Sequence, residues 1–431
     1  MFGFFDSQQK KMRENASNWI DVANKVWSYR RDQMSPAEAE DLVRRREELR
    51  RLLRDKADAA RLKLGIESLE GVLARTGGAV YPKGSLAENV EFFLVAAIVI
   101  FGIRTYFVQP FKIPTNSMWP TYYGMTAENF PPGEEAPGPV GRLFRLAAYG
   151  AQRRTAVAPR DGEVSIVLQA SQNSVAYTVA DGRSWLVLPA KVKEYTFYVD
   201  GAPATVQVPV DFSDRDFDRV VFRTFFKDGA AFAAQYEAAL AAGRVESMSG
   251  FHGGRLLPVG RRVRAGEPIL RFDVMTGDQL FVDRMSYHFV RPSVGQGFVF
   301  RTDNIPDIAR TFGAQYFIKR LVGTPGDVVE MREPRLYRNG SPITGSVAFE
   351  LNAQRVPPYL GYFNATREDP RYSLLFKGEP VTVPAGSFLA LGDNSHDSFD
   401  GRYWGYVPAA DVVGRPLFIY YPLTRRWGSA R

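Results

Sequence analysis

Residues 315–323 read QYFIKRLVG and continue into the turn TPGD. Side chains two residues apart lie on the same face of a strand. Lys319 would therefore share a face with Phe317 and Leu321, and its neighbour Arg320 would point the opposite way. Pro and Gly directly after the run are typical of a turn. The segment predicts a half-buried strand that carries a lysine among apolar side chains.

Runs of the same kind follow one another after Pro110, separated by turn residues. Their alternation of apolar and polar residues is typical of half-buried strands, so we expect an all-β body. One helix-like run, AAFAAQYEAALAAG at 230–243, interrupts it, and residues 126–160, rich in Pro and Gly, read as a loop or the start of an insertion. The strand-like runs are EVSIVLQ (163–169), RSWLVLPA (183–190), KEYTFYVDG (193–201), ATVQVPVDF (204–212), PILRFDV (268–274), QLFVDRM (279–285) and QGFVFRT (296–302).

The composition supports a large β-rich protein and excludes some classes of chemistry. The 431 residues are 45% hydrophobic and include 31 Phe, 20 Tyr, 38 Gly and 28 Pro, which suit pleated surfaces and turns. Cysteine is absent, which excludes thiol catalysis, thiolate metal sites and disulfide bonds. The net charge of +8 fits nucleic acid or an anionic membrane surface. No basic stripe with interleaved aromatics occurs, so we expect no nucleic-acid partner.

Residues 1–91 are highly charged and helical in pattern. Ser35, Pro36 and Glu38 form a capping-box start, and one long helix is expected to run from there to the glycines at 77 and 78, where a helix can end. A helical hairpin with residues 9–33 is favoured over a coiled coil, because the Leu spacing is only loosely heptad. The run of arginines is expected to form a solvated face, and contact with anionic lipid is the weaker alternative.

An apolar stretch, FFLVAAIVIFGI, lies at 92–103. Extended to Val108 it has 17 residues, at the lower end of the about 17 to 25 needed to span a bilayer, and Arg104 could extend to the lipid headgroups. We expect a single membrane span at 92–108, with a buried core helix as the alternative. The arginines before it favour a cytoplasmic N-terminus. A cleaved signal peptide is not expected this far into the chain.

A serine nucleophile needs a base, and the usual base is histidine. The chain has only His252, His288 and His396, for which we expect structural or surface roles. His396 is followed by an aspartate and a serine, but triad partners normally come from distant segments. No metal site is expected, since cysteine and an H-E-x-x-H motif are absent. A lysine can act as the base if burial lowers its pKa by several units, and Lys319 is the candidate. Its alternative role is to protect a sheet edge.

Four segments lie in order after the apolar stretch: FKIPTNSMWPT (111–121), GDQLFVDRMSY (277–287), YFIKRLVGTPGDVVEM (316–331) and LGDNSHDSFDGRYWGYVP (391–408). Together they resemble the bacterial type I signal (leader) peptidases. The resemblance implies a signal-peptidase-like antiparallel β fold and no cofactor. It also implies four parts of the chain: a charged helical cytoplasmic region (1–91), a transmembrane helix (92–108), a catalytic core (109–124 and 267–431) and an inserted β-rich subdomain (125–266).

The same resemblance implies roles for individual residues. Ser117 is expected to be the nucleophile and Lys319 the general base, with the Ser117 backbone N–H and the Thr115 hydroxyl as oxyanion donors and Ser398 orienting the lysine. Three positions depart from the family pattern: Asn116 replaces the usual glycine, Trp119 is bulkier than common, and Gly401 stands where serine is frequent. The residues expected to brace the site are Arg320, Asp393, Asp400 and Arg402, and those expected to form apolar substrate pockets are Ile113, Met118, Tyr122, Phe317 and Ile318.

We therefore expect a membrane-anchored endopeptidase that removes N-terminal signal peptides from exported preproteins by Ser-Lys acyl-enzyme catalysis. It would lie in the bacterial cytoplasmic membrane, with its catalytic domain outside the cytoplasm. Its partners would be preproteins and membrane lipid, without metal. Two alternatives stay open: a catalytically inactive, membrane-tethered binding or scaffold protein, and a soluble self-cleaving regulator.

Overall fold

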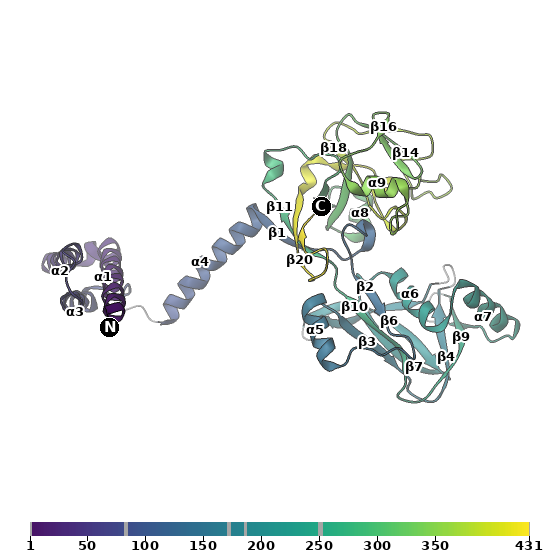
Figure 1. Cartoon of the computed structure of the whole chain (residues 1–431), viewed down its shortest axis with the longest axis horizontal. Coiled ribbons are helices and arrows are strands. Elements are labelled where there is room, and N and C mark those ends of the chain that lie inside the picture. Colours follow the sequence, from purple (N-terminus) through teal and green to yellow (C-terminus); the bar gives the residue numbers. More distant parts are fainter. Residues whose placement is uncertain (1, 82–84, 170–173, 185–187, 249–252, 431) are drawn as a thin grey trace. The chain divides into compact units, whose positions relative to one another are not determined.

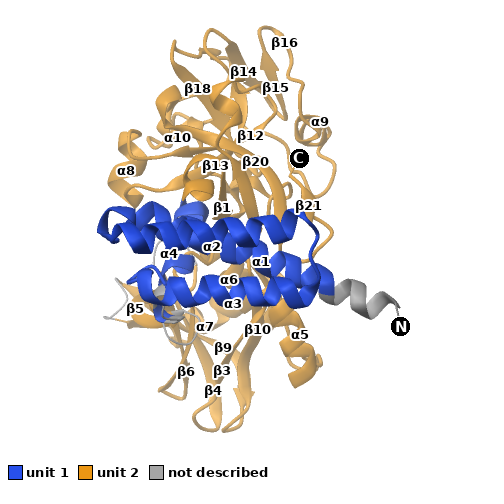
Figure 2. Ribbon diagram, turned by 90° about the vertical axis from the view of Figure 1, so that its left-hand side faces the viewer, with its two compact units in different colours: residues 1–101 blue, residues 102–431 orange. Residues whose placement is uncertain are grey.

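The computed structural model describes residues 2–81, 85–169, 174–184, 188–248 and 253–430. The chain forms two compact units, Met1–Phe101 and Gly102–Arg431, which Figure 2 shows in two colours. One helix, α4 (Ser85–Tyr106), begins in the first unit and ends in the second. Of the three histidines, His252 lies outside the described residues.

The first unit packs three helices around its own apolar core. They are α1 (Phe2–Arg30), α2 (Pro36–Arg54) and α3 (Ala59–Thr76), and a short 3-10 turn, η1 (Arg31–Gln33), follows α1. The predicted capping box is present, because the Ser35 side chain and Glu38 satisfy each other's backbone N–H groups. Buried core residues come from all three helices: Ala16, Ile20, Ala23, Val26, Leu42, Leu49, Leu62, Ile66, Leu69, Val72 and Leu73.

The single long helix expected after Ser35 is wrong. The chain turns between α2 and α3, where Lys56 takes a left-handed conformation with φ of 52°. Asp58 then caps a new helix by accepting a hydrogen bond from the Arg61 backbone N–H at 2.8 Å. An aspartate cap competes well with continued helix, and the turn lets the apolar side of α3 pack against α1 and α2.

The apolar stretch at 92–103 forms the greater part of α4. Residues Glu88–Tyr106 are long and apolar enough to cross a membrane by length and composition, and large side chains such as Phe92, Ile98 and Phe101 are exposed. The predicted end at Val108 is too late, because Val108 begins a strand and pairs with Asp283.

Within the second unit, one lobe is built on an eight-stranded antiparallel sheet with the order β1-β11-β20-β12-β13-β18-β19, and β21 also pairs with β20. We call residues 107–124 and 277–430 the core lobe (Figure 1). Its sheet contains β1 (Val108–Lys112), β11 (Gln279–Asp283), β12 (Gly297–Arg301), β13 (Tyr316–Gly323), β18 (Ser387–Leu391), β19 (Val407–Pro408), β20 (Val412–Tyr421) and β21 (Gly428–Ser429).

A smaller four-stranded sheet with the order β16-β15-β14-β17 completes the core lobe. Its strands are β14 (Val328–Arg332), β15 (Arg335–Arg338), β16 (Ser341–Pro342) and β17 (Val381–Thr382). The helices and 3-10 turns of this lobe are η2 (Asn116–Met118), η3 (Ser286–His288), α8 (Pro306–Phe312), α9 (Val347–Gln354), η4 (Ser395–Asp397), α10 (Gly401–Trp404) and η5 (Ala409–Asp411).

The other lobe, residues 125–276, is called the insertion lobe here. It holds a three-stranded sheet, β2-β10-β3, and a six-stranded sheet, β5-β6-β4-β9-β8 with β7 beside β6. The strands are β2 (Thr126–Asn129), β3 (Gln152–Val157), β4 (Gly162–Leu168), β5 (Tyr177–Ser184), β6 (Leu188–Val199), β7 (Ala202–Pro209), β8 (Glu246–Met248), β9 (Gly254–Val263) and β10 (Pro268–Met275). The helices are α5 (Pro139–Tyr149), α6 (Asp214–Phe225) and α7 (Gly229–Ala241).

The strand pairing changes two details of the sequence prediction. Residues 126–160 are only partly a loop: residues 130–138 contain no helix or strand, and β2, α5 and β3 account for most of the rest. Pro139 lies in the first turn of α5, and Gly150, at φ 61°, ends it. Strand β10 pairs with β2 and β3, and its Leu270 and Phe272 pack in the insertion lobe. We therefore place the end of the insertion after β10, and the division into parts stays a proposal. The run RSWLVLPA includes residues 185–187, which lie outside the described residues.

Candidate active site

Ser117 lies in the 3-10 turn η2, directly after β1, and is 7% exposed. The turn is tied to the loop that follows β18. The backbone N–H of Asn394 donates to the Ser117 carbonyl at 3.1 Å, and the Asn394 side-chain amide donates to the Asn116 carbonyl at 3.0 Å. Two segments far apart in the sequence thus hold the serine in one position.

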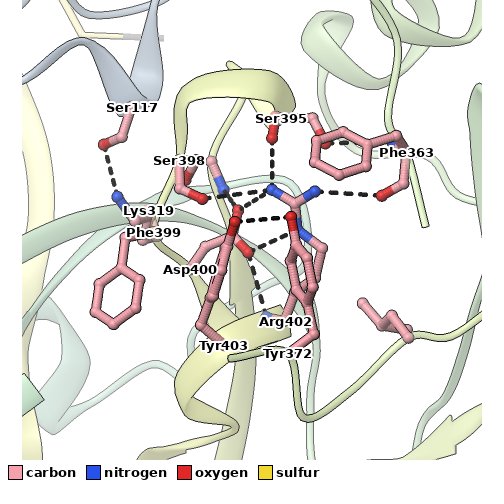
Figure 3. A network of polar contacts seen from close by, with 12 residues as sticks. Ser117, Lys319, Phe363, Tyr372, Ser395, Ser398, Phe399, Asp400, Arg402 and Tyr403 are labelled. Atoms are coloured by element: carbon pink, nitrogen blue, oxygen red, sulfur yellow. Dashed lines mark hydrogen bonds and ion pairs between the residues drawn. The ribbon is translucent and has the colours of Figure 1, made fainter. Parts of the chain in front are cut away.

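Lys319 projects from the middle of β13 toward this turn. Its Nζ lies 2.6 Å from the Ser117 Oγ, and the two residues are 202 positions apart in the chain (Figure 3). Lys319 is 4% exposed, and its Nζ lies 5.5 Å from the centre of the Phe317 ring. The predicted placement of Lys319 with Phe317 on one face of the strand is confirmed. An interior strand, with β12 and β18 on either side, excludes the edge-protecting role.

Burial sets the charge state of this lysine. It lowers the pKa of Lys319 from the ordinary 10.5 to about 8, against the opposing effect of the nearby Asp400 carboxylate. Removing an ammonium group from water disfavours its charged form. A neutral amine is therefore available near neutral pH, and it can accept the proton of a hydroxyl at hydrogen-bond distance.

Two buried Arg-carboxylate pairs lie beside the dyad. Arg320 points away from Lys319 and donates to Asp393, with Nε at 3.0 Å from Oδ1. Arg402 donates to both oxygens of Asp400, at 2.9 and 3.0 Å. All four residues are 0 or 1% exposed.

The pairs also order the loop around η4. Arg402 donates to the Ser395 carbonyl at 2.6 Å (Figure 3), and Asp400 accepts the Gly392 backbone N–H at 3.0 Å. Their charge-assisted hydrogen bonds are of the strong kind. The pairs thus fix the loop that carries Asn394 and Ser398.

Comparisons with known proteins show similarity to one family. Residues 270–421 match the family described as signal peptidase, peptidase S26. This part of the chain is similar to the signal peptidase family. The match begins at residue 270, so it includes Lys319 and both Arg-carboxylate pairs but not Ser117. The tertiary structure places Ser117 beside the matched region.

Individual relatives support the same family. A probable signal peptidase I-1 of Synechocystis is 32% identical over 153 residues, which are 36% of this chain and 66% of that protein. A signal peptidase I of Leptolyngbya laminosa is 33% identical over 148 residues, 34% of this chain and 62% of that protein. The chain thus spans just under two thirds of the length of these relatives. A solved signal peptidase I from Enterococcus faecalis V583 is 28% identical and covers 29% of this chain and 97% of its own, with a TM-score of 0.20 that supports no argument about fold.

Ser398, expected from the signal peptidase resemblance to orient the lysine, is close to the dyad but makes no such hydrogen bond. Its Oγ is buried and has no hydrogen-bond partner in the described part of the chain. It packs against Gly392, where an added Cβ would lie 2.1 Å from the Ser398 Oγ and 2.5 Å from the Ser117 carbonyl oxygen. Only glycine at position 392 permits the Ser398 and Ser117 segments to come this close. The role of Ser398 in orienting Lys319 stays a prediction.

The other expected signal peptidase residues fall into two groups. Thr115 is exposed, and its hydroxyl does not cap the η2 turn. Of the expected pocket residues, Phe317 and Ile318 are half-buried, whereas three are almost fully enclosed. Those three, in one hydrophobic cluster, are Ile113, Met118 and Tyr122. The oxyanion and pocket roles remain predictions.

Sequence reasoning missed part of the surroundings of Ser117. Asn116 had been singled out as a departure from the family pattern, and its side chain donates to Asp216 of α6 at 2.9 Å. Thr121 donates to Asp393 at 2.5 Å. His396 stacks near Phe363, with ring centres 4.8 Å apart, in keeping with a structural role. In the sequence, only the unusual Asn116 pointed to this contact. Its partner Asp216 could not be predicted, because it lies in the insertion, 100 residues away.

Proposed function

We propose that this chain is an endopeptidase that removes N-terminal signal peptides from exported preproteins through a Ser117-Lys319 dyad. The observation that carries the proposal is the buried 2.6 Å contact between the Lys319 Nζ and the Ser117 Oγ. The family match of residues 270–421 and the lowered pKa of Lys319 support it.

The reaction follows from this geometry. Neutral Lys319 accepts the Ser117 proton as the serine oxygen attacks the carbonyl carbon of the scissile peptide bond. The Ser117 N–H and the Thr115 hydroxyl donate to the oxyanion, and such donors contribute about 3 to 4 kcal/mol each in comparable sites. The protonated lysine gives its proton to the leaving amine. Water then attacks the acyl-enzyme ester with Lys319 again as base.

Substrate binding is proposed to use the backbone of an extended segment, with small side chains at the first and third positions before the cut. An extended peptide can pair with a strand of the enzyme as an added strand. Half-buried Phe317 and Ile318 lie on the same strand as the base and would contact these small side chains.

Helix α4 is proposed to anchor the enzyme in the cytoplasmic membrane, with the first unit in the cytoplasm and the core lobe outside it. The length, composition and exposed apolar side chains of Glu88–Tyr106 support the anchor. Anchoring would keep the dyad near the membrane segment of a preprotein, which raises the effective concentration of substrate.

The test is cleavage of a purified preprotein by the detergent-solubilised full chain. Ser117→Ala and Lys319→Ala are each expected to lower the rate by more than about 1,000-fold, while both variants keep the wild-type melting temperature within a few degrees. The exposed lysine Lys377 supplies the matched control, and Lys377→Ala is expected to cleave at the wild-type rate.

Cleavage by either dyad variant at the wild-type rate would refute the dyad. A correctly folded wild type that cleaves no preprotein would favour the alternative of an inactive, membrane-tethered binding protein. The two outcomes can be told apart, because the preprotein is cleaved in the first and not in the second.

A further inference from the structure

Helix α6 of the insertion lobe begins with three alternating aspartates, two of which fix the helix within its own lobe. Asp214 accepts a hydrogen bond from the Lys193 Nζ at 2.6 Å. Asp218 accepts from the Ser174 hydroxyl at 2.7 Å and from the Val175 backbone N–H at 2.8 Å. Carboxylates near a helix N-terminus also interact favourably with its dipole. The start of α6 is therefore held from two directions.

Apolar packing against strands β6 and β10 holds the same helix in place. The Phe217 ring stacks on Tyr195 of β6 with centres 3.5 Å apart and meets Phe272 of β10 edge-on at 5.9 Å. Phe217, Val220 and Val221 are almost fully buried. Losing one polar contact should thus lower the stability of the insertion lobe without displacing α6.

The third aspartate, Asp216, contacts the other lobe. It is 6% exposed and accepts from the Asn116 side-chain amide at 2.9 Å and from Arg219 at 2.7 Å. The same Asn116 amide group donates to the Met125 carbonyl at 3.1 Å, and its oxygen accepts the Gly124 backbone N–H at 3.0 Å. The Asn116 side chain is thereby held on both sides.

Asn116 is the residue directly before Ser117, and both belong to the η2 turn. A change in the Asn116 backbone would move the Ser117 Oγ relative to the Lys319 Nζ, and the hydrogen bonds of the Asn116 side chain restrain that backbone. Helix α6 also reaches the η4 segment, since Arg215 donates to Asp397 at 2.8 Å and to the His396 carbonyl at 3.1 Å. That pair is exposed and contributes little energy, so the buried Asp216 contact is the main link.

We propose that Asp216 is a positioning residue: through Asn116 it holds the Ser117 turn at the distance from Lys319 that proton transfer requires. The role of the insertion lobe in catalysis would then be to fix the nucleophile. This inference rests on the proposed function, in which Ser117 is the nucleophile. A misplacement of about 1 Å can cost about 100-fold in rate, so a single side-chain contact is enough for a large effect.

The kinetic test compares three variants of the full chain in the preprotein assay. Asp216→Ala is expected to lower kcat by about 10- to 100-fold with KM changed less than about threefold. Asp216→Asn keeps an acceptor for the Asn116 amide and is expected to restore kcat to within about fivefold of wild type. Asp218→Ala, which removes an anchor of the same helix, is expected to keep the wild-type kcat.

A second measurement does not depend on cleavage. Hydrogen-deuterium exchange of peptides covering residues 116–125 and 393–399 is expected to be faster in Asp216→Ala than in wild type and unchanged in Asp218→Ala. If the wild type cleaves no preprotein, the proposed function fails, and the exchange still decides whether Asp216 holds the turn. Unchanged exchange in Asp216→Ala, a wild-type kcat in that variant, or equal losses in Asp216→Ala and Asp218→Ala would overturn the proposal.

Discussion

At the scale of single residues, the charge state of Lys319 should control the rate. The neutral amine is the proposed base, and its pKa is lowered to about 8. We predict that kcat/KM rises with pH, with a midpoint near 8, and levels off above it. The profile is measured with one preprotein from pH 6 to 9.5. The residual activity of Lys319→Ala is the control and should not show this rise near pH 8. A midpoint near 6.5 would instead point to a histidine.

The same pKa shift makes Lys319 costly for stability. Below about pH 8 the folded state must bury an ammonium group, whereas the unfolded chain keeps it solvated up to its ordinary pKa of 10.5. The wild type should therefore gain stability as pH rises from about 8 toward 10.5.

Replacing the charge tests this reasoning. Lys319→Met is predicted to raise the free energy of unfolding by about 1 to 3 kcal/mol at pH 7. The advantage should shrink by pH 9.5, because the wild-type lysine is then largely neutral when folded. Thermal or urea unfolding at the two pH values measures the difference. An advantage of equal size at both would contradict the pKa shift of Lys319.

At the scale of elements, α4 presents its apolar side chains outward. Ile98, near the middle of Glu88–Tyr106, is 71% exposed. Ile98→Asp is predicted to lower the fraction of the chain that stays in membranes after alkaline washing, since a charge at the centre of a bilayer costs about 3 kcal/mol. Leu64, 66% exposed on α3, gives the matched control Leu64→Asp, which should leave the fraction unchanged. Equal losses in the two variants, or a washable wild type, would argue against a membrane span.

At the scale of the whole molecule, the first unit has a core of its own. Every residue of that cluster lies between Met12 and Tyr81, so the three helices need no contact with the second unit to bury their apolar faces. A chain of residues 1–81 is predicted to be helical and to unfold cooperatively with heat when followed by circular dichroism. Leu49→Asp, in the centre of the core, should abolish the transition. A gradual, non-cooperative loss of helix in the unsubstituted chain would mean that the unit depends on the rest of the protein.

Local patterns in the sequence determined much of this protein. Alternation predicted β13 and the placement of Lys319 with Phe317, and the capping box at Ser35 predicted the start of α2. The absence of cysteine together with scattered histidines left a lysine as the candidate base. The strand face and the cap are short-range signals that can be read within a few positions, and the absence of cysteine is read from the composition.

Only the tertiary structure decided which distant groups meet. Three features depend on how sheets and loops pack. They are the contact of Ser117 with Lys319 across 202 residues, the pairing of β10 with β2 and β3, and the Ser398 hydroxyl, which has no hydrogen-bond partner among the described residues. The Asn116–Asp216 contact is the clearest case, because its two residues belong to different lobes. The periodicity of the sequence indicates which side of a helix or strand is buried. The packing of the whole chain decides which other element covers that side.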